Sequence, residues 1–218
     1  MKVVFIEAKR KFSNMNLDLS ALKGIKRIGL LSTVQFLPAL PEIEHELKKN
    51  NIKVFKAKTL ANESQILGCD VSAAEKIKGK VQAFLLLSSG KWHALMLSRL
   101  EKPIFIYSGR IEKLSENDIS KFSMKRKAAM VKFLSSDKIG IIVSTKPGQF
   151  RLKEAFALKE HLEKRGKKAF IFIADIISIS ELENFNMKIW VNTACPGLFF
   201  DSSNIINIED VKNIEKFK

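Results

Sequence analysis

The chain is poor in the residues from which catalytic and metal sites are usually built. It has two cysteines and three histidines, and no Cys-x-x-Cys or similar short spacing that would mark a local metal site. It contains no Ser/His/Asp arrangement and no pair of carboxylates that would suit hydrolytic catalysis. No apolar run approaches the roughly 18 residues needed to span a bilayer, and the first residues do not resemble a signal peptide. We therefore expect a cytoplasmic protein with no membrane contact, whose cysteines are thiols or ligands.

Acidic residues are also in deficit. The 38 lysines and arginines outnumber the 23 aspartates and glutamates, which gives a formal net charge of +15, and such a balance can indicate a nucleic-acid partner. The lysines, however, are spread over helix faces, and the densest cluster is Lys121 with residues 125–127. We interpret the charge as solvated helix faces and expect no direct nucleic-acid binding. A partner that is acidic or carries RNA stays open.

Apolar runs of strand length alternate with segments of helical period, which is typical of an α/β protein with parallel sheets. A hydrophobic content of 46% is enough for one large core or two small ones. We expect strands at residues 26–33, 52–57, 81–87, 103–107, 138–145, 169–174 and 188–193, with an isolated strand at 3–6. We expect helices at residues 40–50 and 120–134, and a long one that ends near Arg165.

The pattern also repeats. Residues 138–145 resemble residues 26–33, since both begin with a lysine, contain Ile-Gly before an apolar run and end in Ser-Thr, and a turn, a long helix and a strand follow both. Such self-similarity indicates an internal duplication. We therefore predict two related α/β domains, residues 8–118 and 136–218, each a short, mainly parallel sheet flanked by helices and joined by a helix at 119–135.

Both cysteines lie among turn-forming residues. Cys69 follows Gly68 and precedes Asp70, and Cys195 stands before a Pro-Gly pair at the end of an expected strand. In parallel sheets ligands gather at the carboxyl ends of the strands, and a thiol near a helix N-terminus has a lowered pKa and binds metal readily. Two unrelated structural thiols are the competing interpretation, because 126 residues separate the two positions.

Two further turns are candidate ligand sites. Residues 88–93, Ser-Ser-Gly-Lys-Trp-His, follow a strand and open a helix, an arrangement that suits anion capture by backbone N–H groups. The segment is not a Walker motif, and a plain strand-to-helix turn explains it equally well. Residues 144–151 occupy the equivalent place in the second repeat, where Gln149 and Arg151 are candidates to hold a carboxylate. Of the three histidines, His93 is the one placed for function.

Six short segments, in order, resemble one family, the diphthamide synthases. They cover nearly the whole chain: residues 5–8, 65–70, 89–93, 125–129, 145–151 and 191–196. The resemblance implies three similar α/β domains, each of which gives one cysteine to a 4Fe-4S cluster. It also implies S-adenosylmethionine at the open iron, a 3-amino-3-carboxypropyl radical from its cleavage, and a histidine of elongation factor 2 as acceptor.

By this resemblance Cys69 is the ligand of the middle domain and Cys195 that of the third domain. The resemblance also makes five residues candidates for binding the methionine moiety: Ser89, Gly90, His93, Gln149 and Arg151. We expect a shortened paralogue that lacks the first domain and its cysteine. Gly197 stands where family members commonly have an arginine after Cys-Pro.

These features leave three functional hypotheses. The first is an enzyme that cleaves S-adenosylmethionine and transfers a 3-amino-3-carboxypropyl group. The second is a non-catalytic paralogue that binds an iron–sulfur cluster or delivers electrons. The third is an α/β binding protein with vestigial cysteines. Since two thiolates complete half of the ligation of a cubane, we expect a homodimer with a shared cluster or a related partner chain.

Overall fold

The structure is a computed structural model that describes residues 4, 6–12, 17–59 and 62–215. The chain divides into two compact units, residues 1–120 and 121–218. Each unit is described by itself below. Helix α4 (Glu116–Ser135) begins in the first unit and continues as the first element of the second.

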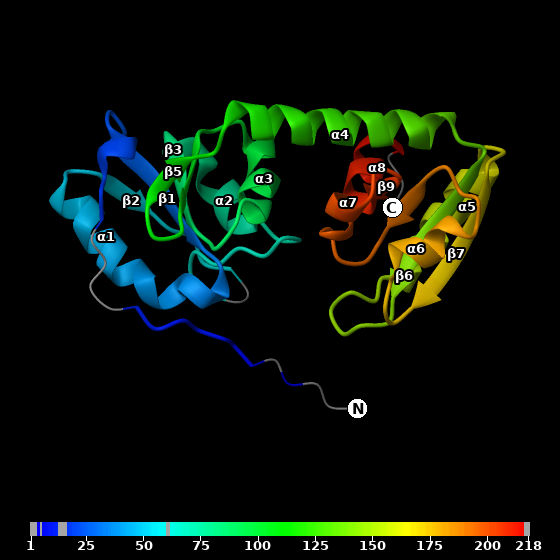
Figure 1. Ribbon diagram of the computed structural model, residues 1–218, viewed down its shortest axis with the longest axis horizontal. Coiled ribbons are helices and arrows are strands. Elements are labelled where there is room, and N and C mark those ends of the chain that lie inside the picture. The colour runs from blue at the N-terminus through cyan, green and yellow to red at the C-terminus, as the bar shows by residue number, and fades with distance from the viewer. Residues whose placement is uncertain (1–3, 5, 13–16, 60–61, 216–218) are drawn as a thin grey trace. The chain divides into compact units, whose positions relative to one another are not determined.

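The first unit is a five-stranded sheet in the order β2-β1-β3-β4-β5 (Figure 1). All neighbours pair in parallel except β4 and β5, which are antiparallel. Its strands are β1 (Arg27–Ser32), β2 (Lys53–Phe55), β3 (Ala83–Leu87), β4 (Ile104–Tyr107) and β5 (Ile111–Lys113). Its helices are η1 (Ser20–Leu22), η2 (Val34–Ala39), α1 (Leu40–Lys49), α2 (Ser72–Ile77), η3 (Lys78–Lys80), α3 (Trp92–Leu97) and η4 (Ser98–Leu100).

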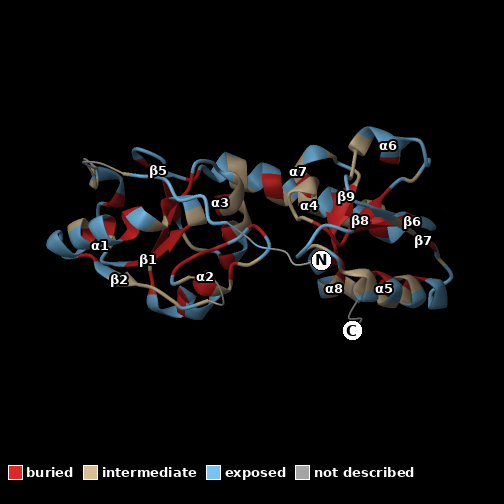
Figure 2. Ribbon diagram, turned by 90° about the horizontal axis from the view of Figure 1, so that it is seen from below, coloured by how far each residue is buried: buried red, intermediate tan, exposed pale blue. Residues whose placement is uncertain are grey.

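Two buried clusters lie on opposite faces of this sheet. Alternate residues of β3 contribute to different clusters, Leu85 to one and Phe84 to the other, because successive side chains of a strand point to opposite faces. All five residues of β3 are buried, as expected for a central parallel strand with helices on both faces. Figure 2 shows β1 of this sheet as buried and much of the surface of α1 as exposed.

The second unit is a four-stranded parallel sheet in the order β7-β6-β8-β9. Its strands are β6 (Lys138–Ser144), β7 (Lys168–Ala174), β8 (Trp190–Asn192) and β9 (Ile205–Asn207). Besides α4, its helices are α5 (Leu152–Lys164), α6 (Ile179–Glu183), α7 (Leu198–Asp201) and α8 (Ile208–Glu215).

The predicted fold class is confirmed: both units are α/β, and each has a mainly parallel sheet flanked by helices. In both, the first strand lies between the second and the third, and the fourth lies beyond the third. Apart from the strand at 3–6, the expected strands and helices are present. Strands β5 and β9 were not predicted, because polar residues interrupt them after one apolar residue in β5 and two in β9. Of the strand predicted at 3–6, Val4 and Ile6 are exposed and irregular, and the rest lies outside the described residues.

The same glycine–aromatic pair joins the first and third strands of each sheet. Gly29 lies opposite Phe84 in the first unit, and Gly140 lies opposite Trp190 in the second. A Cβ atom at Gly29 would lie 2.6 Å from the Phe84 ring, and one at Gly140 would overlap the Trp190 ring. In each pair the aromatic ring therefore occupies the space that a side chain on the glycine would fill. The presence of this pair in both sheets supports the duplication.

We predict that Gly140→Ala lowers the free energy of unfolding by about 1–3 kcal/mol, because a methyl group must displace the packed Trp190 ring. Urea denaturation measures the change. Gly79→Ala is the matched control, since an added Cβ there has no atom within 4 Å, and its stability should stay close to that of the parent. Equal stability of the two variants would contradict the packing role.

Candidate functional site

The loop that carries Cys69 is fixed to the carboxyl end of β1. The backbone N–H of Ser32 donates to the Ser64 carbonyl, and that of Ile66 donates to the Ser32 carbonyl, both at 2.9 Å. Leu67 and Asp70 then exchange backbone hydrogen bonds of 2.9 and 3.2 Å, so the chain turns tightly around Gly68 and Cys69. The side chain of Cys69 is exposed at the tip of this turn.

Helix α2 starts directly after this turn. The Asp70 carboxylate accepts a 2.9 Å hydrogen bond from the backbone N–H of Ser72, its first residue. The acidic neighbour of Cys69 therefore satisfies a helix N–H group that would otherwise lack an intrahelical partner. Cys69 therefore lies three residues before the first residue of α2.

The Cys69 turn packs directly on α3. Gly68 is buried, and a Cβ atom there would overlap the indole of Trp92, so only glycine permits this approach. The Trp92 ring in turn contacts His93 edge-on, with centroids 4.3 Å apart. Burial lowers the pKa of His93 below the usual 6.5, which favours the neutral imidazole. The turn and the start of α3 thus form one site at the carboxyl end of the first sheet.

Ser89 and Gly90 lie at this same end of the sheet. The turn is held by the buried Ser88, whose hydroxyl donates to the Gly90 carbonyl at 3.3 Å and lies 3.4 Å from the Gly90 backbone nitrogen. Ser89 and Gly90 are themselves exposed. Ser89 and Gly90 therefore lie in the turn between β3 and α3, and α3 carries the Trp92 ring that packs on Gly68 beside Cys69.

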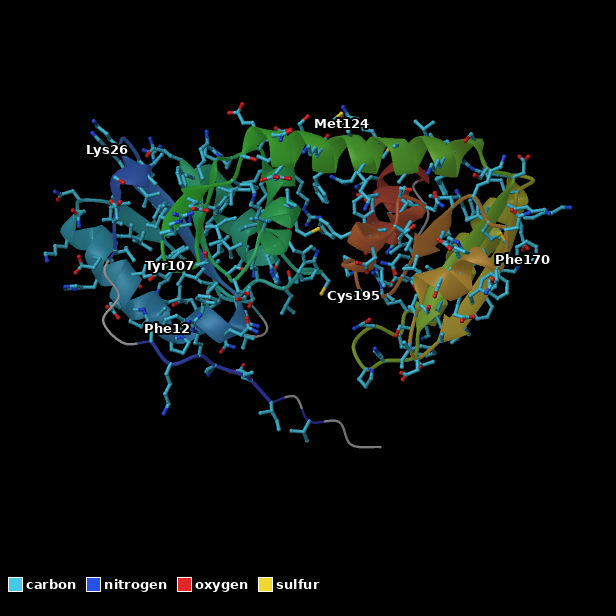
Figure 3. All side chains as sticks on the ribbon, viewed as in Figure 1. Phe12, Lys26, Tyr107, Met124, Phe170 and Cys195 are labelled. Carbon is cyan, nitrogen blue, oxygen red and sulfur yellow. The ribbon has the colours of Figure 1, made fainter. Side chains whose placement is uncertain are left out.

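In the second unit Cys195 follows β8 in a turn that buried asparagines hold (Figure 3). The Asn192 amide donates 2.8 Å hydrogen bonds to the Cys195 carbonyl and to Asn207, and its carbonyl accepts one of 2.9 Å from the backbone of Ala194. Asn207 donates further to the Pro196 carbonyl at 3.3 Å. Both asparagines are buried, and Cys195 is half-buried.

Helix α4 secures the segment that follows Cys195. Lys125 donates to the Phe200 carbonyl at 3.0 Å, and its ammonium lies 5.0 Å from the centre of the Phe199 ring. Phe122 stacks on Phe200 and meets Phe199 edge-on, with centroids 5.4 and 5.7 Å apart. Burial lowers the pKa of Lys125. Because α7 begins at Leu198, these contacts fix the downstream side of the Cys195 turn.

Gln149 and Arg151 lie in the loop after β6, at the same end of the sheet as the Cys195 turn, because β6 and β8 are parallel neighbours. The Arg151 guanidinium bonds the Glu154 carboxylate through two contacts of 2.5 and 2.6 Å, and Glu209 at 2.6 Å. Lys212 also binds Glu154. Burial opposes the charge of Arg151, but its bonds to the two carboxylates outweigh burial and raise its pKa.

These ion pairs give the Arg151 side chain a different role from the one predicted. The sequence suggested a guanidinium available to an incoming carboxylate, but the structure pairs it with two carboxylates of its own unit. Arg151 joins α5 to α8 instead. Gln149 is half-buried, and its backbone N–H donates to the Lys146 carbonyl at 3.0 Å.

A groove of about 460 Å³ in the first unit lies apart from these residues. Its apolar wall comes from η2 and α1, and its charged wall is an ion-paired chain in which Lys56 lies 2.9 Å from Glu44 and 2.8 Å from Glu63. None of the ligand-binding or metal-ligating residues predicted from the sequence lines this groove.

Neither unit holds a complete metal site of its own among the described residues. Each contributes one cysteine, and nowhere in residues 4, 6–12, 17–59 and 62–215 do three His, Cys, Asp or Glu side chains gather as metal ligands. The chemistry of the two thiols nevertheless suits iron, because cysteine thiolates are the usual ligands of iron–sulfur clusters.

Sequence reasoning missed three residues that position the cysteines. Trp92 supports the Cys69 turn, and Asn192 and Asn207 support the Cys195 turn. Asn192 had a visible signal, because a polar amide in an apolar strand directly before a cysteine needs hydrogen-bond partners when buried. Asn207 lies on β9, which the sequence did not reveal.

Comparisons with known proteins place these residues in a family. The model of the diphthamide synthesis protein family matches residues 1–205. The 2-(3-amino-3-carboxypropyl)histidine synthase of Pyrococcus horikoshii is 28% identical over 206 residues, which cover 91% of this chain and 59% of that protein. The synthase of the same name from Methanocaldococcus jannaschii is 29% identical, over 89% of this chain and 52% of its own length.

Solved structures agree with the sequence matches. The crystal structure of Dph2 from Pyrococcus horikoshii with a 4Fe-4S cluster has a TM-score of 0.76 and 26% identity, over 88% of this chain and 57% of that one. The chain therefore spans between half and three-fifths of the length of these relatives. No helix in the described part of the chain is long and apolar enough to cross a membrane.

We predict that Asn192→Ala loosens the Cys195 turn and lowers the free energy of unfolding by about 1–3 kcal/mol, since it leaves buried polar groups without partners. Alkylation of Cys195 by iodoacetamide, followed on its peptide by mass spectrometry, should become faster. Asn184→Ala, at an exposed asparagine after α6, is the control. Unchanged alkylation in Asn192→Ala would show that the amide does not hold the turn.

Proposed function

The chain belongs to the diphthamide synthesis protein family, and from this membership we propose that it is an iron–sulfur protein whose 4Fe-4S cluster is held by Cys69 and Cys195. The supporting observation is that each cysteine lies on a turn at the carboxyl end of a parallel sheet, with buried groups dedicated to that turn. A vestigial cysteine would need no such support, so the third hypothesis is the weakest.

Two thiolates leave ligand positions of a cubane to be filled. One completion is a two-fold dimer in which both copies contribute both cysteines, which gives four thiolates and no open iron. The other takes a ligand from a related partner chain or from solvent and leaves an iron open to substrate. The first suits a structural or electron-transfer role, and the second suits catalysis.

For the catalytic form we propose that the protein cleaves S-adenosylmethionine and transfers a 3-amino-3-carboxypropyl group to a histidine of elongation factor 2. A bound, reduced cluster supplies one electron for the cleavage. In this proposal the exposed turn at Ser89 and Gly90 and the neutral ring of His93 bind polar groups of the methionine moiety; the exposure of the turn and the burial of His93 support these roles.

The second sheet contributes less to this binding. Gln149 is near the Cys195 turn, but a substrate carboxylate would have to compete with Glu154 and Glu209 for Arg151. We therefore assign Arg151 to positioning the loop between β6 and α5.

The rival is a non-catalytic paralogue that binds a cluster or delivers electrons. Two observations favour it: Arg151 is bound by its own carboxylates, and Gly197 leaves no cationic side chain directly after Pro196. Both reduce the positive charge available to a substrate carboxylate near the Cys195 turn.

We predict that Cys69→Ala and Cys195→Ala each lower the iron and sulfide bound per chain after anaerobic reconstitution, by about half or more, since a cubane normally has four protein thiolates. Stoichiometry separates the two completions, with about one-half cluster per chain for a shared cluster and about one otherwise. Iron and sulfide contents equal to those of the parent in both variants would contradict the assignment of these ligands.

We further predict that the reduced, reconstituted protein releases methylthioadenosine from S-adenosylmethionine, at rates that depend on Cys69 and Cys195. Chromatography measures the product with and without elongation factor 2. The Gly79→Ala variant, altered at an open surface position, should match the parent. A protein with a full, reducible cluster that forms no product would support the non-catalytic paralogue instead.

A further inference from the structure

The amino-terminal end of the first sheet gathers cationic residues that lie far apart in the sequence. Strands β2, β1, β3 and β4 are parallel neighbours, so the residues that begin them or shortly precede them meet at this end. Figure 3 labels one of these residues, Lys26, at the start of β1. All are exposed except Lys102, which is partly exposed. The cationic cluster consists of six residues: Lys26, Arg27, Lys53, Lys78, Lys80 and Lys102.

The pairing of the strands sets the spacing of the cationic cluster. Arg27 and Lys53 are direct partners across β1 and β2, and the backbone N–H of Lys53 donates to the Lys26 carbonyl at 2.8 Å. From Lys53, on β2, to Lys102, just before β4, the cluster extends over three strand spacings, about 14 Å. One strand of a nucleic-acid duplex carries a phosphate about every 3.4 Å along the helix axis. The cluster therefore matches the length of about four phosphates.

The charges of the cationic cluster are not compensated within the described part of the chain. None of its side chains forms an ion pair with a carboxylate there, whereas Lys56 and Arg99 of the same unit do. Glu101 is an acidic neighbour of the cluster, but a large excess of positive charge remains. Like charges directly opposite each other destabilise a sheet, and Arg27 and Lys53 form such a pair. A bound polyanion would relieve this repulsion.

Gln82 adds a neutral hydrogen-bond donor to the cluster. Its side-chain oxygen accepts bonds from the backbone N–H groups of Lys26 and Arg27, at 2.8 and 2.9 Å. Because both contacts come from N–H donors, the amide oxygen must face β1, which leaves the NH2 group to donate elsewhere. A neutral donor among cations suits the phosphates and the 2′-hydroxyl groups of RNA, and the 2′-hydroxyl is the group that distinguishes RNA from DNA.

We propose that the cationic cluster binds the phosphate backbone of base-paired RNA. Charge complementarity identifies a polyanion, and the length of the cluster suits a regular row of phosphates. Proteins that hold unpaired bases stack them on exposed aromatic side chains, and no aromatic side chain is exposed in the described part of the first unit. A duplex keeps its bases stacked inside and is bound through its phosphates and 2′-hydroxyl groups, which are the groups that this cluster can contact.

The cationic cluster is remote from the Cys69 turn. That turn is bonded to the carboxyl end of β1, whereas the cluster lies at the amino end, about 17 Å away along the strand. RNA binding therefore does not rest on the proposed function and needs no iron. The cations of the cluster are dispersed over residues 26–102, so the sequence alone led us to expect no direct nucleic-acid binding, and the sheet brings them together.

Removal of two charges from the cluster tests the proposal. Fluorescence anisotropy measures the dissociation constant of the full-length chain for a labelled RNA duplex of about 16 base pairs, at several salt concentrations. Lys26→Gln combined with Lys53→Gln should raise this constant about tenfold and reduce its salt dependence by about two counterions. Lys121→Gln combined with Lys127→Gln is the matched control, because it removes the same charge from exposed positions of α4, and it should bind RNA like the parent. Circular dichroism establishes that both variants are folded.

A parent that does not bind the RNA overturns the proposal. Equal losses in the two double variants also overturn it, because binding would then follow the net charge of the chain. A DNA duplex of the same sequence that binds as tightly overturns the assignment to RNA, and tighter binding of polyglutamate at the cluster would assign it to an acidic protein instead. The iron-free and reconstituted proteins should bind the RNA equally, and a requirement for iron would contradict the location.

Discussion

The close approach of an aromatic ring to a strand glycine is the contact on which both units depend. Gly29 with Phe84 and Gly140 with Trp190 join the first and third strands of their sheets. The turns with Ser89, Gln149 and Cys195 follow β3, β6 and β8, and the Cys69 loop is hydrogen-bonded to the carboxyl end of β1. The same pair at the same place in both sheets is a three-dimensional mark of the duplication. The contact requires a glycine opposite a large aromatic residue. A substitution of either residue therefore changes the packing of the other.

Although the two sheets have the same strand order, the turns that carry the two cysteines are held by different interactions. In the first, a tryptophan on α3 closes over Gly68 and supports an exposed Cys69 by packing. In the second, buried asparagines bond the backbone around a half-buried Cys195. Packing tolerates small shifts, whereas a buried amide must keep all its partners or lose free energy. The support of Cys69 is therefore sensitive to side-chain volume, and that of Cys195 to loss of a hydrogen-bond partner.

Charged side chains within each unit form compensating ion pairs. Arg151, Glu154, Glu209 and Lys212 compensate one another between α5 and α8, and in the first unit Lys56 lies between two glutamates. The net charge of +15 is carried largely by exposed cationic side chains on helices, in loops and at strand ends, where screening by salt is strong.

The sequence by itself determined the fold class, the duplication and the turns that hold the cysteines, because strand-length apolar runs, helical periodicity and turn residues are local signals. It also carried the family resemblance that the comparisons confirmed. Tertiary structure decided the partners of Arg151, the support of Gly68 by Trp92, and the bond between Asn192 and Asn207, which lie 15 residues apart. It also decided the order of the strands in each sheet. These features depend on which elements become neighbours, and a one-dimensional pattern does not specify the neighbours of a side chain.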